Sequence, residues 1–438
     1  MTTCRFALSN RPAVVYDSHM GNHLRAYKFR FYPTQAQRRQ LAIDFGHARW
    51  VWNQALAIRS TFYRRFGESV TGVDVSRDIT FLKTLPAYAW LKDANSTCLV
   101  QKLRDQDAAF AAFFAGRARY PRFKKRHHAQ AIRYQLDQRQ IHRTFDAQQK
   151  LLRLPKLGAL KLKWSRTPAG IPKMATVRLD SAGRYWVTLA IEERVETLPA
   201  RTGVVGLDLG VKDLVVDSNG GRYPNPRHLN RHLKRLRKAN RSLARKVKGS
   251  NRWHRARLRL ARCHAKVRNT RTDALHQLTT TLIRENQAIC VESLHVKGMV
   301  RNRRLARHIA DAGFGELVRQ LEYKAAWYGR TLISIDQWFP STRTCGHCGV
   351  VNDQLTLKDR SWTCPGCGTD HDRDLNAAQN ILVEGLKQYL PAGSGKAMRV
   401  EGDTHRPPVA VPNRTPPASD EARIGPTPES LSGTGATG

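Results

Sequence analysis

Two pairs of cysteines constrain the fold of this chain more than any other feature. Each pair has the form Cys-x2-Cys, and 15 residues separate the two pairs. This spacing is typical of a zinc ribbon, whose four thiolates close the coordination shell of a structural zinc ion and leave no open catalytic position. We therefore expect zinc to stabilise a small fold here. The predicted ligands are Cys345, Cys348, Cys364 and Cys367.

The chain also carries a large excess of positive charge. Its 438 residues have a formal net charge of +40. Self-repulsion of this size destabilises a compact monomer, so a polyanionic partner is the natural explanation. A hydrophobic content of 41%, with nine Trp and fourteen Phe, argues for folded domains rather than a basic disordered tail. No run of about 18 apolar residues occurs, and the other cysteines are scattered, so we expect a cytoplasmic protein without a membrane partner.

The positive charge is concentrated in residues 222–271, which contain 19 Lys or Arg and no Asp or Glu. Apolar residues recur there in a 4-3-4-3-4 stagger and a turn interrupts them, which predicts a basic helical hairpin over 227–270. Solvated helix faces normally mix both signs of charge, so we interpret the hairpin as a phosphate track. Residues 120–126 form a second basic segment with interleaved aromatic side chains. The candidate nucleic-acid contacts are Arg122, Lys124, Lys125, Lys234, Arg241 and Arg245.

Hydrophobic patterning predicts a multidomain chain of α+β and α/β character. Short strand-like runs predict a small β-barrel, interrupted by a helical bundle with amphipathic periodicity. From residue 204, strands and helices alternate as in an α/β layer. The predicted parts are an N-terminal extension (1–24), a β-barrel (25–33 plus 126–200), a helical insertion (34–125), an α/β domain (201–340 plus 370–390), the zinc ribbon (341–369) and a disordered tail (391–438).

Asp208 and Glu292 are the two acids whose positions in predicted strands best suit a metal site. Asp208 shares its face of the strand with Gly206 and Gly210, which would leave room for a metal ion or a substrate backbone. Glu292 follows small residues on its own strand face. The structural alternative for each acid is an ion pair with arginine.

Asp374 is a third acid, at the head of an Ala-rich helix. Its structural alternative is a helix N-cap, and Asp372 is a second candidate for the same metal-binding role. Mg2+ or Mn2+ prefers oxygen ligands on a rigid scaffold, and two such ions about 4 Å apart promote phosphodiester hydrolysis. No Ser/His/Asp set and no phosphate-binding GxxxxGK[ST] loop competes. The residues alone therefore indicate metal-dependent phosphodiester hydrolysis on a basic scaffold.

Motifs spread over residues 25–390 resemble the TnpB family, accessory proteins of bacterial insertion sequences and relatives of type V CRISPR effectors. The resemblance lies in RuvC-type nuclease and zinc-ribbon motifs, and in two N-terminal segments. The nuclease and ribbon motifs are VGLDLGVKD at 205–213, VESL at 291–294, STRTCGHCG at 341–349 and HDRDLNAAQNI at 371–381. The N-terminal segments are AYKFRFYPT at 26–34 and YPRFKK at 120–125.

This resemblance implies an RNA-guided DNA endonuclease with an RNase H-like (RuvC) domain. A guide RNA from the transposon end would pair with target double-stranded DNA, while the barrel and the helical insertion grip the RNA and the duplex. Asp208, Glu292 and Asp374 would correspond to the metal-binding carboxylates of the family. The protein would be bacterial and nucleoid-associated through its DNA.

Three alternatives stay open from the sequence. A transposase would use the same carboxylates for DNA strand transfer. A non-cleaving RNA-guided repressor would occupy its target without cutting it, although the presence of all three carboxylates argues against that. A zinc-ribbon RNA-binding protein without a DNA target would use the acids only structurally.

Overall fold

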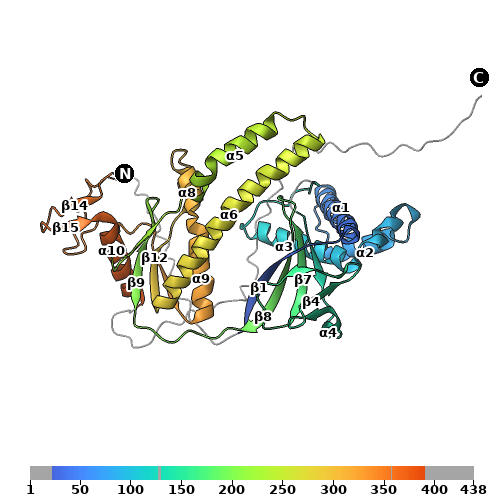
Figure 1. Cartoon of the computed structure of the whole chain (residues 1–438), viewed down its shortest axis with the longest axis horizontal. Coiled ribbons are helices and arrows are strands. Elements are labelled where there is room, and N and C mark those ends of the chain that lie inside the picture. Colours follow the sequence, from blue (N-terminus) through green and yellow to red (C-terminus); the bar gives the residue numbers. More distant parts are fainter. Residues whose placement is uncertain (1–21, 127–129, 357, 390–438) are drawn as a thin grey trace, which may run out of the picture.

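The computed structural model describes residues 22–126, 130–356 and 358–389. The predicted N-terminal extension up to residue 21 and the predicted tail over 391–438 lie outside the described residues. Figure 1 shows two main bodies. A sheet with its covering helices lies at one end, and a second sheet with the ribbon lies at the other. The predicted multidomain mixture of helices and several sheets is confirmed.

The first body is a five-stranded antiparallel sheet in the order β2-β7-β8-β1-β6, with β2 and β6 at its edges. Tyr27, Phe29 and Phe31 alternate along β1 and are buried, as the period of a half-buried strand requires. Three short strands, in the order β3-β4-β5, form a smaller sheet nearby. The strands are β1 (Asn22–Phe31), β2 (Gln130–Gln135), β3 (Phe145–Asp146), β4 (Leu151–Leu154), β5 (Gly158–Ala159), β6 (Leu162–Lys163), β7 (Pro172–Leu179) and β8 (Tyr185–Arg194), with the short helix α4 (Ile141–Thr144) before β3.

Helices fill the chain between β1 and β2, where the helical insertion was predicted. They are α1 (Gln35–Phe66), α2 (Gly72–Leu82), the 3-10 helix η1 (Pro86–Asp93) and α3 (Ser96–Phe114). A capping box begins α1, since the Thr34 hydroxyl accepts from the Gln37 amide and the Gln37 side chain accepts from the Thr34 amide. Apolar positions of α1, such as Leu41 and Phe45, join the core under the first sheet.

The second body is built on a five-stranded sheet in the order β11-β10-β9-β12-β13. The strands are β9 (Val204–Asp208), β10 (Asp213–Asp217), β11 (Arg222–Pro224), β12 (Ala288–Glu292) and β13 (Thr331–Ile335). The first three are antiparallel neighbours, and β9, β12 and β13 run parallel. Their near-continuous apolar residues are buried on both faces, as in sheets covered by helices.

The basic segment forms the predicted helical hairpin. Helices α5 (His228–Ala244) and α6 (Asn251–Glu285) run antiparallel, and Figure 1 shows them side by side. A narrow seam of Leu236, Ala239, Cys263 and Val267 joins them. The far half of α6 packs on α9 (Phe314–Tyr328) in the core of the second body, and α7 (Val296–Met299) and α8 (Ala306–Ala312) precede α9. Within the described residues no helix is both long enough and apolar enough to cross a membrane.

Helix α10 (Arg373–Tyr389) packs on the other face of the second sheet. A Cβ atom at Gly206 would lie 2.2 Å from the Ala378 carbonyl oxygen and 2.6 Å from the Leu382 amide nitrogen. A Cβ atom at Gly385 would lie 2.4 Å from the Cys290 sulfur. The two glycines therefore let helix and sheet approach closely.

This packing corrects one prediction. Gly206 was expected to leave room for a metal ion or a substrate backbone, but the backbone of α10 fills that space. A Cβ atom at Gly210 would meet the Asp213 carbonyl oxygen at 2.7 Å, so that glycine serves the turn between β9 and β10.

The ribbon lies between β13 and α10 and is attached to α10 by side-chain amides. Its strand β14 (Ser361–Thr363) pairs with β15 (Asp370–Asp372), which directly precedes α10. Asn376 donates to the Thr344 carbonyl at 2.8 Å and accepts from the Gly346 amide at 2.9 Å. Asn380 donates to the Ser341 carbonyl at 2.8 Å and to the Thr344 carbonyl at 2.7 Å. One helix thus contacts both the sheet and the ribbon.

We predict that Gly206→Ala lowers the thermal unfolding midpoint, because the added methyl group would collide with the backbone of α10. Overpacking of this kind costs about 1–3 kcal/mol. The matched control is Gly315→Ala in α9, where an added Cβ meets nothing within 4 Å. Helix propensity makes that change neutral or slightly stabilising. Equal midpoints for the two variants in a thermal melt would contradict the packing account.

Candidate active site and metal centre

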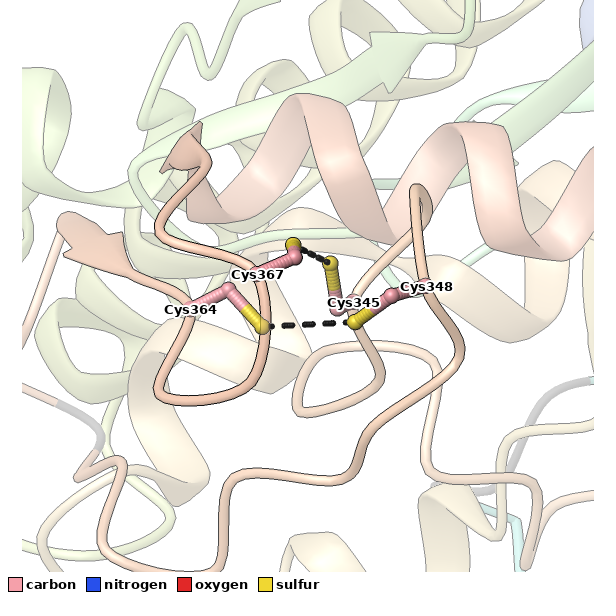
Figure 2. Close-up of side chains that lie close together, drawn as sticks. All are labelled: Cys345, Cys348, Cys364 and Cys367. Atoms are coloured by element: carbon pink, nitrogen blue, oxygen red, sulfur yellow. Dashed lines mark hydrogen bonds between the residues drawn. The ribbon is translucent and has the colours of Figure 1, made fainter.

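The four predicted cysteines converge from two loops of the ribbon, as Figure 2 shows. Their sulfur atoms all lie within 4.8 Å of one another. The sulfurs of Cys345 and Cys367 are 3.7 Å apart, and those of Cys348 and Cys364 are 3.5 Å apart. Four thiolates at a Zn–S distance of about 2.3 Å on a tetrahedron would be about 3.8 Å apart. The predicted cluster is confirmed, and its donor set fits zinc.

Two neighbours of the cysteines were not predicted from the sequence. His371 Nε2 lies 3.0 Å from the Cys345 sulfur, and the His371 ring packs on Trp362 with centroids 4.8 Å apart. The Thr369 hydroxyl, 3.2 Å from the Cys367 sulfur, contributes to lowering the pKa of Cys367 to about 6. A lowered pKa favours the thiolate, the form that binds metal. The one sequence signal that could have identified His371 is its position directly before Asp372-Arg373-Asp374.

The structure places Asp208 and Glu292 at equivalent ends of neighbouring strands. Asp208 ends β9 and Glu292 ends β12, and these strands run parallel with Leu207 opposite Val291. Because the register pairs the preceding residues, both carboxylates emerge at the same edge of the sheet. Asp374 lies in the first turn of α10, which packs across both strands. The fold thus brings together three acids that are far apart in the sequence.

The electrostatics of Asp208 show that the three acids are neighbours. Burial, and to a lesser extent the negative charges of Asp374 and Glu292, raise the pKa of Asp208 to about 7, partly opposed by Arg373. Burial also raises the pKa of Glu292, against the hydrogen bond that the Ser341 hydroxyl donates to it at 3.5 Å. Within the described residues, the cysteine cluster is the one group whose ligand atoms all lie within 4.8 Å of one another. The oxygens of the three carboxylates are therefore more widely spaced than its sulfurs.

The structure also distinguishes Asp374 from Asp372. Asp372 accepts a hydrogen bond from the Leu375 amide at 2.9 Å and pairs with Arg222 at 2.8 Å, so Asp372 provides the N-cap interaction of α10. The N-cap alternative for Asp374 is therefore wrong. The Asp374 side chain is 14% exposed and pairs with Arg373 at 2.8 Å and with Arg360 at 3.5 Å. Asp374 is the acid whose charge acts on Asp208.

Among the six candidate nucleic-acid contacts, Lys124 is half-buried, and its ammonium group packs on an aromatic ring of the protein. It lies 3.3 Å from the ring centroid of Trp52, and burial lowers its pKa to about 8. The same loop is fixed to α1, because the Trp52 indole donates to the Arg122 carbonyl at 2.9 Å. The other five side chains are exposed.

A further set of cations, which we call the cationic seam, lies between the first sheet and α6. It consists of Lys28, Arg178, Arg184 and Arg268. Lys28 on β1 has a lowered pKa because of burial and the positive charges of Arg268 on α6 and of Arg178 and Arg184. Contact between the two elements is direct, since a Cβ atom at Gly183 would meet Leu258 of α6 at 3.0 Å. The sequence could not reveal the seam, because its members are up to 240 residues apart.

Comparisons with known proteins assign the family. A model of the IS605 OrfB family described as "Probable transposase" matches residues 188–303, and one described as "Cas12f1-like, TNB domain" matches residues 314–381. A Streptomyces pristinaespiralis protein named "Putative RNA-guided DNA endonuclease" is 43% identical over 385 residues, covering 87% of this chain and 94% of that protein. The chain belongs to the TnpB family.

Other TnpB relatives agree with this assignment. Escherichia coli K12 has a relative named "Putative RNA-guided DNA endonuclease InsQ", 32% identical over 83% of this chain and 92% of that protein. The structure of a Cas12f1–sgRNA–target DNA complex aligns with 82% of this chain and 98% of that chain, at a TM-score of 0.51 and 14% identity. At this identity the match shows the Cas12f-like fold alone. The resemblance noted from the motifs is confirmed.

Asp208→Asn is predicted to stabilise the metal-free protein at pH 8. The raised pKa means that the folded state holds a proton up to about pH 7, whereas the unfolded chain releases it near pH 3.9. The carboxyl group of Asp208 therefore destabilises the fold increasingly as the pH rises from about 3.9 to about 7. At higher pH this destabilisation stays at its full size. Thermal melts should show a higher midpoint for the variant at pH 8 and almost no difference near pH 4.

The same melts test the metal. Mg2+ should raise the midpoint of the wild-type protein at pH 8 more than that of Asp208→Asn, because binding to the folded state stabilises it. Asp353→Asn, which removes an exposed acid of the ribbon, is the control and should behave like wild type. A destabilised Asp208→Asn protein at pH 8 would contradict the account that burial and neighbouring negative charges disfavour the ionised form of Asp208.

For the cysteine cluster we predict that Cys364→Ser abolishes stoichiometric zinc and lowers the resistance of the ribbon to proteolysis. Serine does not supply the thiolate that completes the four-sulfur shell. Metal analysis of the purified protein checks this, with Cys263→Ser as the control because Cys263 lies in the seam of the α5–α6 hairpin. One zinc per chain in Cys364→Ser would refute the four-thiolate site.

Proposed function

We propose that this protein is an RNA-guided DNA endonuclease that hydrolyses phosphodiester bonds with a RuvC-type carboxylate site. The observation that carries the proposal is the convergence of Asp208, Glu292 and Asp374 from β9, β12 and α10. The family assignment supports the guide, because full-length relatives bear the name RNA-guided DNA endonuclease. The origin in an IS605-type transposable element follows from the same family.

The three carboxylates fit Mg2+ or Mn2+. They are oxygen donors on rigid elements. Burial and the negative charges of Asp374 and Glu292 raise the pKa of Asp208, and a divalent cation would favour its ionised form. When bound, the cation supplies an activated water and stabilises the leaving 3′ oxygen. Ser341 donates to Glu292, while Arg373 and Arg360 hold Asp374, so each of these carboxylates is oriented by a neighbour.

We assign the parts of the chain as follows. The second sheet, with α6, α9 and α10, serves as the RNase H-like nuclease domain (201–340 plus 370–390), supported by its mixed five-stranded order and the acids at one edge. The first sheet (25–33 plus 126–200) serves as the wedge-like barrel domain, and helices α1–α3 (34–125) as the recognition insertion. Zinc in the ribbon (341–369) stabilises the segment that positions the start of α10.

Guide RNA and target double-stranded DNA are the polyanions that balance the charge of +40. Two surfaces support this assignment. The α5–α6 hairpin exposes Lys234, Arg241 and Arg245, and the cationic seam brings Lys28 and Arg268 near one another. Burial and the positive charges of Arg268, Arg178 and Arg184 lower the pKa of Lys28, so a phosphate bound beside these cations would be favourable and nucleic acid would bind there.

Cleavage of a plasmid matched to the co-purified RNA tests the proposal. The RNA that accompanies the protein is sequenced, and a plasmid with a matching site is incubated with the complex and Mg2+. We predict that wild type linearises the plasmid and that Asp374→Ala does not, since Asp374 would be a metal ligand. The control Asp372→Asn changes an acid two residues away and should keep cutting, because asparagine retains the N-cap acceptor and only the charge of the ion pair with Arg222 is lost.

Other outcomes would identify the alternatives. Joined products with transposon ends and no RNA requirement would indicate a transposase, the activity named in the matching family description. Occupancy of the matching plasmid without cutting by wild type would indicate a repressor. Normal cutting by Asp374→Ala would refute the assignment of the third carboxylate.

A further inference from the structure

Trp338 is unusually exposed for a tryptophan. The chain has nine tryptophans, all within the described residues, and eight of them are buried or half-buried. Trp338 is 80% exposed. Tryptophan is highly buried on average, so an indole presented almost entirely to solvent needs an explanation.

The loop that carries Trp338 is held on both sides of the indole. The Trp338 amide donates to the Asp336 side chain at 2.7 Å, which fixes the turn before it. The next residue, Phe339, packs into the apolar cluster of Ile335 and Ile381 between the sheet and α10. The Ser341 amide then donates to the Phe339 carbonyl at 2.8 Å. The backbone therefore presents the indole outward while its neighbours are anchored.

Both ends of this loop lie at the carboxylate site. Ile335, the last residue of β13, is directly opposite Glu292 in the parallel register. Ser341 contacts the Glu292 carboxylate at 3.5 Å. Trp338 is three residues from each, and an extended chain spans at most about 3.6 Å per residue, so its Cα lies within roughly 11 Å of both. The loop that carries the exposed indole thus begins and ends beside a proposed metal ligand.

Trp338 stands alone among its neighbours in the sequence as an exposed large hydrophobic side chain. Between residues 306 and 349 it is the one large hydrophobic side chain, within the described part of the chain, that is strongly exposed. Protein interfaces use contiguous apolar patches of several hundred Å2, which a single indole does not supply. A flat aromatic ring beside a nuclease site instead suits a nucleobase, because every base has a π face and stacking tolerates any sequence.

We propose that Trp338 is a stacking platform for a base of the DNA strand that enters the carboxylate site. This inference rests on the proposed nuclease function and adds a positioning residue to it. By stacking on one base, Trp338 holds the strand so that a nearby phosphodiester lies at Asp208, Glu292 and Asp374. Sequence-independent stacking matches a protein whose sequence specificity comes from a guide. The DNA strand is favoured over the guide RNA because Ser341 of the same loop contacts Glu292, and Glu292 would face the phosphodiester bond to be cut.

Single-turnover cutting by the protein–RNA complex is the first test, with Trp338→Ala, Trp338→Phe and the control Leu24→Ala. Leu24 is 71% exposed and lies on β1, which is not in the sheet that carries Asp208 and Glu292. Loss of one base–aromatic stack corresponds to roughly a 5- to 150-fold effect, so Trp338→Ala should cut about tenfold more slowly or worse. Trp338→Phe should recover most of the rate and Leu24→Ala all of it. Binding of matching duplex, measured in an Asp208→Ala background, should be unchanged by Trp338→Ala.

Crosslinking provides a readout that does not need activity. With p-benzoylphenylalanine in place of Trp338 and the Asp208→Ala change, irradiation of the target-bound complex should join the protein to a DNA strand. Crosslinks to the guide RNA alone, or no crosslink, would overturn the inference, as would wild-type rates in Trp338→Ala. If wild type binds but does not cut, the proposed nuclease function fails separately, while a DNA crosslink still supports the stacking contact.

Discussion

The close packing of α10 on β9 and β12 is the contact on which the candidate site depends. Gly206 and Gly385 allow the helix and the sheet to meet at backbone distance, and any side chain at Gly206 would push them apart. This contact carries Asp374 to the sheet edge where Asp208 and Glu292 end their strands. The same helix holds the ribbon through Asn376 and Asn380. The cysteine cluster, the ribbon, α10 and the carboxylates are therefore linked by one continuous series of contacts.

The fold gathers charges of one sign at two places, and each gathering destabilises the protein when no ligand is bound. Burial and the negative charges of Asp374 and Glu292 disfavour the ionised form of Asp208 and raise its pKa to about 7. At the cationic seam, positively charged side chains lie close together, with Lys28 of β1 near Arg268 of α6. Each concentration of charge is unfavourable alone, and each is relieved by a ligand of opposite sign. The negative site suits a divalent cation, and the positive surfaces suit nucleic acid.

Local patterns predicted much of this arrangement. Cysteine spacing predicted the sulfur cluster, a one-sided run of cations predicted the helical hairpin, and acids in apolar strands marked Asp208 and Glu292. Features that depend on distant partners could not be predicted. The role of Gly206 depends on a helix about 170 residues later, and Lys124 engages Trp52 rather than solvent because the loop folds back on α1. The sequence could not distinguish the roles of Asp372 and Asp374, because only the folded chain shows that Asp372 caps α10.

The most direct test of the central claim is to locate the cation itself. Crystals of the complex grown with Mn2+ can be examined for anomalous scattering at the manganese edge. The account predicts one or two manganese peaks with oxygen ligands from Asp208, Glu292 and Asp374, and none on Asp372. Manganese bound through Asp372 instead of Asp374, or no peak at the ends of β9 and β12 under conditions where wild type cuts DNA, would contradict it.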